Sequence, residues 1–455
     1  MCHTGKTATA TAVRRHAIFT RKEIEDRVKQ GEILVIINTK VYNLTKFINH
    51  HPGGDLAIWH MAGKDATDAV LAYHPEQVIE KRMPHFCIGE LAPNAQHASK
   101  LSLAYRRLDA KLKAEGMYET QYWFYVREAA KMLAIWVAML GLVVWGPQHW
   151  MTYAASALLG STLWHQAAFV AHDAGHSGIT HDAKTDMILG ICLGNFLGGL
   201  SLGWWKHNHN VHHIVTNDPA HDPDIQHMPF FAISTKFFQN LYSTYYKRVL
   251  NFDSAAQFFI SLQHHLFYII LCFGRFNLYV LGWSYVLRKG PVPYRKLEIT
   301  CMALFWAWFI PLLSYLPNWK YRVAYILLSH MMTVFLHLQI TLSHFGMEAQ
   351  ENPQDDFAAM ALKTTMDVEC PIWMDWFHGG LQFQVEHHLF PRLPRHNLRK
   401  IRPHVLKLAK DHDLPFHSYG FVKSNQVVLA VLQSVAHQVR AVLRVDPRTA
   451  HAHAL

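Results

Sequence analysis

Two pairs of long uncharged segments constrain the fold of this chain more than any other feature. Residues 132–147 and 150–170 contain no Asp, Glu, Lys or Arg, and only a short turn divides them. Residues 300–316 and 323–342 form a second pair around a turn at 317–320. Each segment approaches the roughly 20 residues needed to cross the hydrocarbon core of a bilayer. The sequence therefore predicts two transmembrane hairpins, which return the chain twice to the same side of a membrane.

Two further apolar segments are ambiguous. Residues 187–205 are rich in glycine, and residues 258–287 contain His264, His265 and Arg275. If either segment crossed the membrane alone, the histidine clusters described below would be divided between the two membrane faces. We therefore expect both segments to lie in the membrane plane or to re-enter it.

The composition also indicates a membrane protein. Hydrophobic residues make up 51% of the 455 residues, and charged residues make up only 17%, below the usual share of about 25%. The net charge of +10 comes from short basic clusters beside apolar segments, such as Arg288, Lys289, Arg295 and Lys296. That placement is typical of chains that face an anionic membrane surface, and it argues against nucleic-acid binding.

Cysteine usage and the N-terminus bear on the compartment. The six cysteines are scattered and include no C-x-x-C pair, so neither a disulfide framework nor a structural zinc site is expected. The catalytic parts are expected to face a reducing cytosol. Residues 1–19 carry basic residues without an apolar core, which argues against a signal peptide.

A soluble domain precedes the first apolar pair. A strand signal at residues 33–37 is followed by the turn-forming motif His51-Pro52-Gly53-Gly54, and His74 lies 23 residues after His51. Two imidazoles on opposite faces of a porphyrin leave its iron no open position, so such iron carries electrons and does not readily bind dioxygen. The segment resembles the cytochrome b5 domain. The resemblance implies His51 and His74 as the axial ligands of haem b.

Three histidine-rich clusters lie at the ends of apolar segments, and their i, i+3 and i+4 spacing places each set on one helix face. The clusters are His172 and His176; His209, His212 and His213; and Gln384, His387 and His388. Ionisable groups at membrane depth are costly and are functional by default. Seven histidines and an amide exceed the four ligands of a zinc site, and nitrogen-rich sites suit iron that changes its oxidation state.

These motifs resemble the cytochrome b5-fused, front-end membrane desaturases over nearly the whole chain. The most specific point of resemblance is Gln384 in place of the first histidine of the third cluster. The resemblance implies two non-haem iron ions and one further ligand at the end of the last membrane helix. His344 fits that place, and His337, two turns earlier, is kept as an alternative. The remaining histidines near the clusters are expected to be surrounding or surface groups: His165, His181, His207, His221, His227 and His378.

The resemblance also implies an activity. A desaturase of this family removes two hydrogens from a lipid chain with dioxygen as co-substrate, and its fused haem domain delivers the electrons. The chain has no G-x-G-x-x-G or flavin signature, so the expected electron source is an external NADH-dependent cytochrome b5 reductase. The haem domain and the histidine clusters are expected on the cytosolic side of the endoplasmic reticulum membrane.

The substrate class is less constrained than the reaction. Residues 204–213 and 379–398 look most similar to the sphingolipid delta-8 desaturases, while delta-6 and delta-5 fatty-acyl desaturases share most of the pattern. A lipid hydroxylase with the same haem domain is a further alternative, against which Gln384 argues. A membrane haem protein that only relays electrons is an alternative of another class.

Four regions are expected along the chain. Residues 17–91 form a small α+β cytochrome b5-like domain, and residues 92–120 form a linker with an interfacial helix. Residues 121–415 form an all-α membrane domain with four transmembrane helices in two hairpins, in-plane helices and a histidine-rich cytosolic cap. Residues 416–455 form a C-terminal amphipathic helix and tail.

Overall fold

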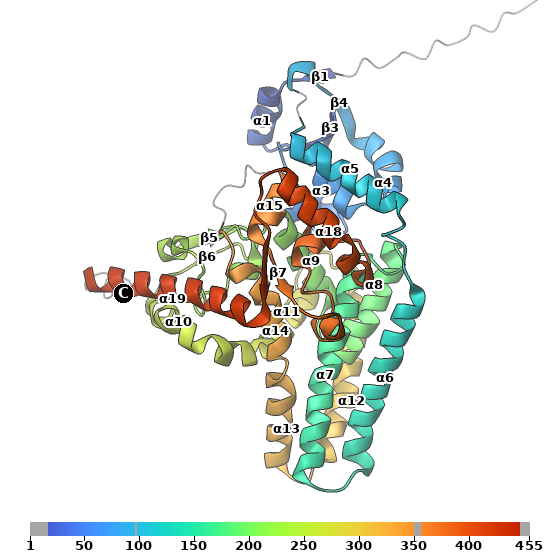
Figure 1. Cartoon of the computed structure of the whole chain (residues 1–455), viewed down its shortest axis with the longest axis vertical. Coiled ribbons are helices and arrows are strands. Elements are labelled where there is room, and N and C mark those ends of the chain that lie inside the picture. Colours follow the sequence, from blue (N-terminus) through green and yellow to red (C-terminus); the bar gives the residue numbers. More distant parts are fainter. Residues whose placement is uncertain (1–16, 96–97, 350–355, 446–455) are drawn as a thin grey trace, which may run out of the picture.

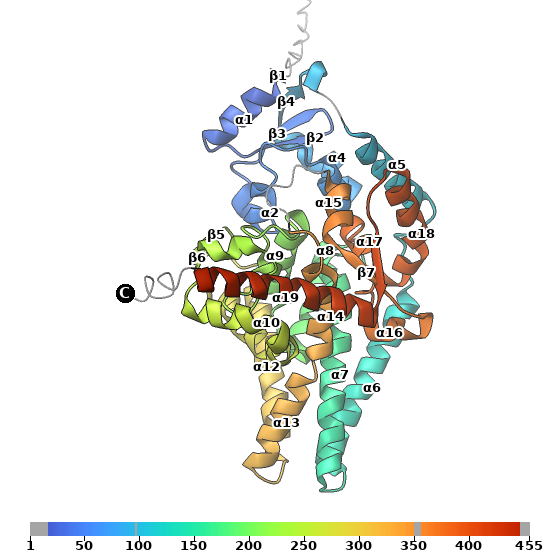
Figure 2. The same cartoon turned by 60° about the vertical axis from the view of Figure 1, so that its left-hand side comes forward.

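The computed structural model describes residues 17–95, 98–349 and 356–445, and it has three tiers (Figures 1 and 2). The N-terminal domain forms one end, short helices and loops form a middle layer, and a bundle of long helices forms the other end. The expectations for residues 1–16, with Cys2, and for the tail after residue 445 lie outside the described residues.

The N-terminal domain is built on a four-stranded sheet in the order β1-β4-β3-β2. Its strands are β1 Ala17–Phe19, β2 Leu34–Ile37, β3 Lys40–Asn43 and β4 Cys87–Leu91. A two-residue turn pairs Ile37 with Lys40, and Asn38 in that turn has φ 56°, which asparagine tolerates. Because side chains alternate along a strand, β2 supplies two small cores on opposite faces of the sheet.

The helices of this domain frame the predicted haem loop. They are α1 Arg21–Lys29, α2 Asp55–Trp59, α3 Thr67–Tyr73 and α4 Glu76–Lys81. A capping box between Thr20 and Glu23 starts α1. Gly54, at φ 95°, lies between His51 and the start of α2, and α3 ends immediately before His74.

The bundle contains two helical hairpins, the pairing expected from the sequence. They are α6 Tyr122–Trp145 with α7 Trp150–Gly175, and α12 Arg295–Ser314 with α13 Trp319–Met331 and α14 Val334–Phe345. The first helix begins before its uncharged segment and therefore includes Glu128. Lys131 and Arg395 pair with that carboxylate and make its burial tolerable.

Residues 183–214 fold into a sharply bent pair of helices. They are α8 Ala183–Ile191, its π-helical continuation η4 Cys192–Leu197, and α9 Leu202–Ile214, which is bent from the first part by 115°. Gly199 has φ +68° at the bend, and the Ser201 hydroxyl accepts the backbone N–H of Trp204 to cap α9. The bend directs α9 and its histidines into the middle layer.

Three more helices complete the apolar part: α10 Ser254–Cys272, α11 Gly274–Leu287 and α19 Phe421–Val445. Helices α10 and α19 lie side by side and run across the direction of the bundle (Figures 1 and 2). Gln263 joins them by donating to the Leu432 carbonyl at 2.9 Å. The predicted segment 258–287 is therefore divided between two helices, which meet at Phe273.

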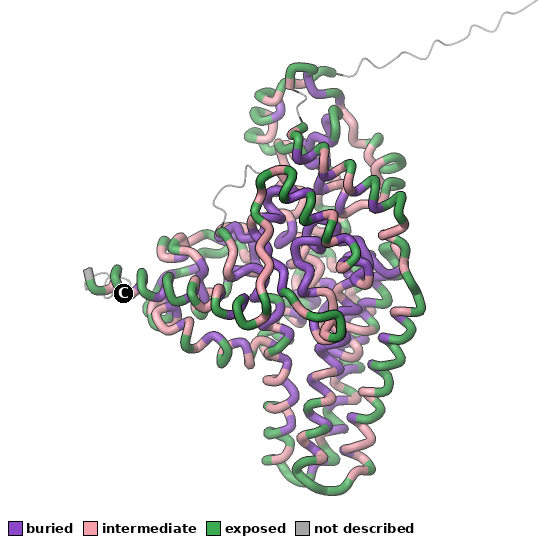
Figure 3. The backbone as a smooth tube through the Cα atoms, in the orientation of Figure 1, coloured by how far each residue is buried: buried purple, intermediate pink, exposed green. Residues whose placement is uncertain are grey.

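Among the described residues, five helices are long and apolar enough to cross a membrane: α6, α10, α12, the α13–α14 pair and α19. Much of the outer side of the bundle is exposed (Figure 3). The exposed residues include large apolar side chains, among them Leu133, Val137, Ile310 and Val323. Such a surface is stable against lipid chains and unfavourable in water. The protein is therefore an N-terminal domain with a small sheet, followed by a largely helical domain with several membrane-capable helices.

The middle layer collects short elements from distant parts of the chain. Its helices are α5 Lys100–Ala114, α15 Phe357–Thr364, α16 Asp375–His378, α17 Gln384–Leu389 and α18 Arg395–Asp411. Its strands are the hairpin β5 Leu241–Ser243 and β6 Arg248–Leu250, and the parallel pair β7 Met366–Glu369 and β8 His417–Gly420. The Tyr105 hydroxyl ties α5 to α17 by donating to the Leu389 carbonyl at 2.7 Å. The five cysteines among the described residues are free.

Candidate haem and metal sites

Two histidines face each other in the N-terminal domain. The ring centres of His51 and His74 lie 6.0 Å apart. His51 Nδ1 donates to the Gly54 carbonyl at 2.8 Å and His74 Nδ1 faces the Val70 carbonyl at 3.2 Å, which leaves both Nε2 atoms free to bind a metal. Metal–imidazole bonds of about 2 Å on both faces of one porphyrin require ring centres about 6 Å apart. The two residues therefore fit a haem.

The surroundings keep these two imidazoles neutral. Burial lowers the pKa of His51, and burial together with the neighbouring His51 lowers the pKa of His74 to about 4. Neutral imidazole is the form that donates a lone pair to a metal, so no proton has to leave before a haem binds.

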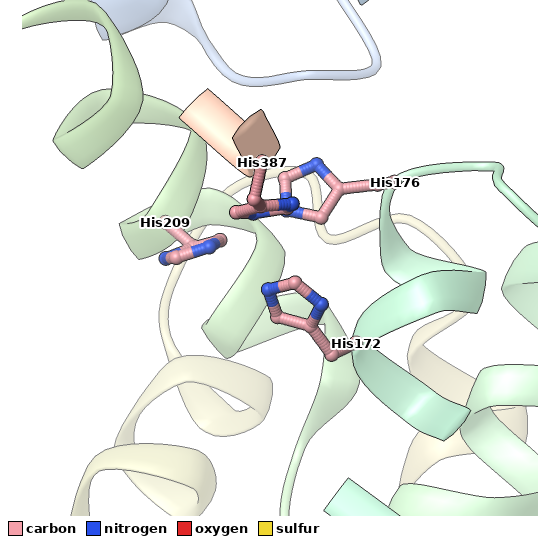
Figure 4. A group of neighbouring side chains, drawn as sticks. All are labelled: His172, His176, His209 and His387. Carbon is pink, nitrogen blue, oxygen red and sulfur yellow. The ribbon is translucent and has the colours of Figure 1, made fainter. Parts of the chain in front are cut away.

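Four histidines form a first group where the bundle meets the middle layer (Figure 4). They are His172 and His176 at the end of α7, His209 on α9 and His387 on α17. One candidate ligand atom from each lies within 4.8 Å of those of the others, and the rings gather around one space. Three helices that are far apart in the sequence are needed to assemble this group.

Three more histidines form a second group beside the first. His212 on α9, His344 on α14 and His388 on α17 also bring their ligand atoms within 4.8 Å of one another. His344 Nδ1 lies 3.3 Å from the Thr364 carbonyl, which orients its ring. His337 belongs to neither group and packs against Gly274, where an added Cβ would come within 3.1 Å of its ring.

His213 lies between the two groups. Its Nε2 is 3.0 Å from His209 Nε2 and 3.1 Å from His387 Nε2, and its ring stacks on that of His388 with centres 4.1 Å apart. Two imidazoles bound side by side to one metal, with bonds of about 2.1 Å, bring their nitrogens to about 3 Å. The spacing around His213 therefore fits metal ligation.

Two carboxylates that the sequence analysis did not single out border these groups. His212 Nδ1 lies 2.9 Å from an Asp222 oxygen, and Asp222 also accepts the backbone N–H of Asn217 at 2.7 Å. Asp224 brings an oxygen within 4.8 Å of candidate ligand atoms of both His209 and His212. The available signal was Asp222-Pro223-Asp224, an acidic pair shortly after a histidine cluster in a chain poor in charge.

The unpartnered polar atoms of the histidine groups support a metal. Among the described residues, His176 Nε2, His213 Nδ1 and His388 Nε2 are buried without a hydrogen-bond partner. Burial, reinforced by neighbouring imidazoles, lowers the pKa of His387 and of His388 well below the ordinary value. Neutral, buried and unpartnered imidazole nitrogens are costly unless a metal takes their lone pairs. The nitrogen-rich donor set with a bordering carboxylate fits iron.

Gln384 and the other histidines have distinct surroundings. Gln384 lies at the start of α17 and lines a small cavity with Phe169, His172, Leu381 and His387. The remaining histidines fall into three settings. His165 and His378 approach Gln339 in a buried polar network. His207 and His221 face the N-terminal domain. His181 is hydrogen-bonded to the Thr120 hydroxyl, and His227 is hydrogen-bonded to the Asp224 carbonyl.

Comparison with known proteins matches both halves of the chain. The family described as "Fatty acid desaturase" matches residues 148–420, and "Cytochrome b5-like Heme/Steroid binding domain" matches residues 20–92. The "Delta 8-(E)-sphingolipid desaturase" of Emericella nidulans is 38% identical, over 94% of this chain and 96% of that protein. The chain belongs to the fatty acid desaturase family.

Two further desaturases extend this finding. The protein of Komagataella phaffii with the same name is 38% identical over 93% of this chain and 94% of its own length, and "Delta(8)-fatty-acid desaturase 1" of Arabidopsis thaliana is 38% identical over 93% and 94%. The desaturase match includes both histidine groups, and the cytochrome b5-like match includes His51 and His74. The expected fusion of a haem-binding domain to a membrane desaturase is confirmed.

Proposed function

We propose that this desaturase introduces a double bond at carbon 8 of sphingolipid long-chain bases, in the E geometry. One observation supports the reaction above all: three histidine clusters, more than 200 residues apart at their extremes, meet in two adjoining groups next to a haem-binding domain. The relatives named above support the substrate class, since two of them carry this regiochemistry and geometry in their names.

Two iron ions are the proposed occupants of the histidine groups. One would be held by His172, His176, His209 and His387, and the other by His212, His344 and His388, with His213 between them and Gln384 beside the first. Iron bound there would supply the dioxygen chemistry needed to remove hydrogen from an unactivated methylene pair. Haem b, held by His51 and His74, is the proposed electron store.

The chain's own residues orient these ligands and shield the site from water. Asp222 holds the Nδ1 side of His212, so that the Nε2 side of the ring faces the second group. The buried side chains of α9 and α17 keep bulk solvent away from the groups. The small cavity beside Gln384 also reaches Phe169, which lies one turn before His172 on α7. A lipid chain coming from the bundle would meet the site there.

We further propose a topology in which α6, α7, α12 and the α13–α14 pair cross the endoplasmic reticulum membrane, while α10 and α19 lie along its surface. The helix ends that carry the histidines then share one side with the haem domain. Arg288, Lys289, Arg295 and Lys296 precede or begin α12 on that side, as expected for a cytosolic face. An external NADH-dependent reductase would reduce the haem there.

Expression in a yeast that makes no unsaturated bases at carbon 8 tests the proposal. Mass spectrometry of long-chain bases should find a new E double bond at carbon 8, and His388→Ala should abolish it at equal protein level. New unsaturation only in glycerolipid acyl chains would contradict the substrate and favour a delta-6 or delta-5 acyl desaturase. Hydroxylated lipids without new double bonds would contradict the reaction. A folded, haem-loaded protein that changes no lipid would favour the electron carrier.

A further inference from the structure

One helix of the desaturase domain contacts the segments that carry both haem ligands. Asn210, on α9, donates from Nδ2 to the Gly53 carbonyl at 3.0 Å, beside His51. His207, one turn earlier on α9, packs against Gly54, where an added Cβ would lie 3.2 Å from its ring, and its Nε2 is 3.8 Å from an Asp55 carboxylate oxygen. The helix that carries three of the candidate iron ligands therefore also supports the His51 loop.

The other haem ligand has a more direct connection. Tyr73 is the residue before His74, and its ring lies edge-on to the ring of His213, with centres 5.9 Å apart and planes at 80°. Phe357 flanks the Tyr73 ring on another side, with ring centres 6.3 Å apart. A path therefore leads from His74, a haem ligand, along the backbone to the Tyr73 ring and from that ring to His213 of the candidate iron site.

The Tyr73 hydroxyl does not explain this placement. It is buried and has no hydrogen-bond partner among the described residues. A buried hydroxyl without a partner is unfavourable, and phenylalanine would fill the same space at no such cost. The contacts of Tyr73 toward the metal centre are therefore those of its ring.

Contacts around the interface hold this geometry. Asp68 on α3 accepts Ser102 Oγ at 2.5 Å and Arg106 Nε at 2.6 Å, both from α5. Leu56 packs with Val211 and Val215 in a shared apolar cluster. With polar contacts at α3 and apolar contacts at α2, the haem domain has one defined orientation on α9.

We propose that Tyr73 positions the electron path from the haem to the metal centre, with its ring filling the gap between His74 and His213. This inference rests on the proposed function. Removal of two hydrogens from the lipid supplies two of the four electrons and two of the four protons that convert dioxygen to two waters, and solvent supplies the other two protons. The other two electrons pass one at a time from ferrous haem, which becomes ferric, and the reductase restores it. Tunnelling is faster through packed atoms than across a gap, so the ring should speed this electron transfer.

Single-turnover kinetics of the full-length, haem- and iron-loaded protein test this path. The haem is reduced without oxygen, oxygen and lipid are then added, and haem reoxidation is followed by absorbance. Tyr73→Leu should slow reoxidation by about tenfold or more, the size typical of a lost positioning contact. Tyr73→Phe should reoxidise at the wild-type rate. Trp59→Leu is the matched control, because Trp59 is also a haem-domain aromatic that faces the desaturase domain, at His221.

Three further readouts separate this role from general damage. The haem spectrum, haem reduction potential and iron content of Tyr73→Leu should equal those of the wild type; if that variant loses haem, Tyr73→Met, which also lacks the ring, replaces it. Equal reoxidation rates in the ring-lacking variant and the wild type would overturn the inference. If wild-type reoxidation did not depend on iron, as judged with the same protein prepared without non-haem iron, the proposed function itself would fail.

Discussion

At the residue scale, the candidate iron site depends on which nitrogen each imidazole presents. Asp222 occupies Nδ1 of His212, and the Thr364 carbonyl lies by Nδ1 of His344, so the Nε2 atoms of both rings are left for a metal. A histidine without such a partner can present either nitrogen to a metal, and it loses more conformational entropy when a metal fixes its ring. The carboxylates of Asp222 and Asp224 therefore help to order the histidines of the site, although nothing in their local sequence marks them as histidine partners.

The two candidates for the ligand from α14 can be separated by substitution. His344→Ala should lose iron from the second group and lose desaturation, since its ligand atom lies with those of His212 and His388. His337→Ala removes a ring two turns away on the same helix and should keep its iron. Iron per chain, measured on purified protein, checks this. Iron loss in His337→Ala with full iron in His344→Ala would reverse the assignment.

At the scale of elements, short connections decide where the third histidine cluster points. Gly379 ends α16 in the left-handed conformation, at φ +58°, and an added Cβ would lie 2.0 Å from the buried Phe169 ring of α7. Only a residue without Cβ lets this turn approach α7 closely. The next helix, α17, carries Gln384, His387 and His388, so this contact fixes their distance from the histidines of α7.

Gly379→Ala should therefore destabilise the site and the fold. The left-handed backbone and the overpacking against Phe169 together cost about 2–4 kcal/mol. Gly420→Ala is the control, because nothing lies within 4 Å of its added Cβ and its φ is not positive. Thermal unfolding and iron content of the two variants check the expectation. A Gly379→Ala protein as stable and as iron-rich as Gly420→Ala would show that α17 does not depend on this turn.

At the scale of the whole molecule, the candidate haem site and the candidate iron site have no ligand in common, and they meet at one interface between the haem domain and α9. No described residue is shared between the His51–His74 pair and the two histidine groups. Helix α9 nevertheless contacts both haem ligand segments and carries part of the iron site. Loading of the two sites should therefore be independent, while turnover requires both.

His74→Ala tests this independence. The variant should lose haem and its absorbance, keep its iron, and lose desaturation, because electrons no longer reach the metal centre through the fused domain. His50→Ala is the control, since His50 is exposed and lies beside His51 outside the facing pair. Absorbance, iron per chain and lipid analysis are measured on the same preparations. Full desaturation by His74→Ala would mean that a separate haem protein can replace this domain.

Much of this organisation could be predicted because it is local. The uncharged segments, the turn before His51 and the i, i+4 spacing of His172 and His176 all act within a few residues. The bend between α8 and α9 was not predictable in its angle, because it depends on the tertiary contacts of Gly199 with Phe305. Asp222 and Asp224 were missed because a carboxylate has no spacing rule that marks it as the partner of a histidine.

The sequence by itself determined the kind of protein: a haem-binding domain, paired apolar segments and histidine clusters at helical spacing. These features follow from periodicity and composition, which can be read from residues that are close together in the sequence. Only the tertiary structure decided how the clusters divide into two groups, that His344 and not His337 lies in one of them, and that Tyr73 meets His213. Some of those contacts join residues more than 100 positions apart, such as Tyr73 and His213, and their geometry comes from packing between helices, which no local pattern records.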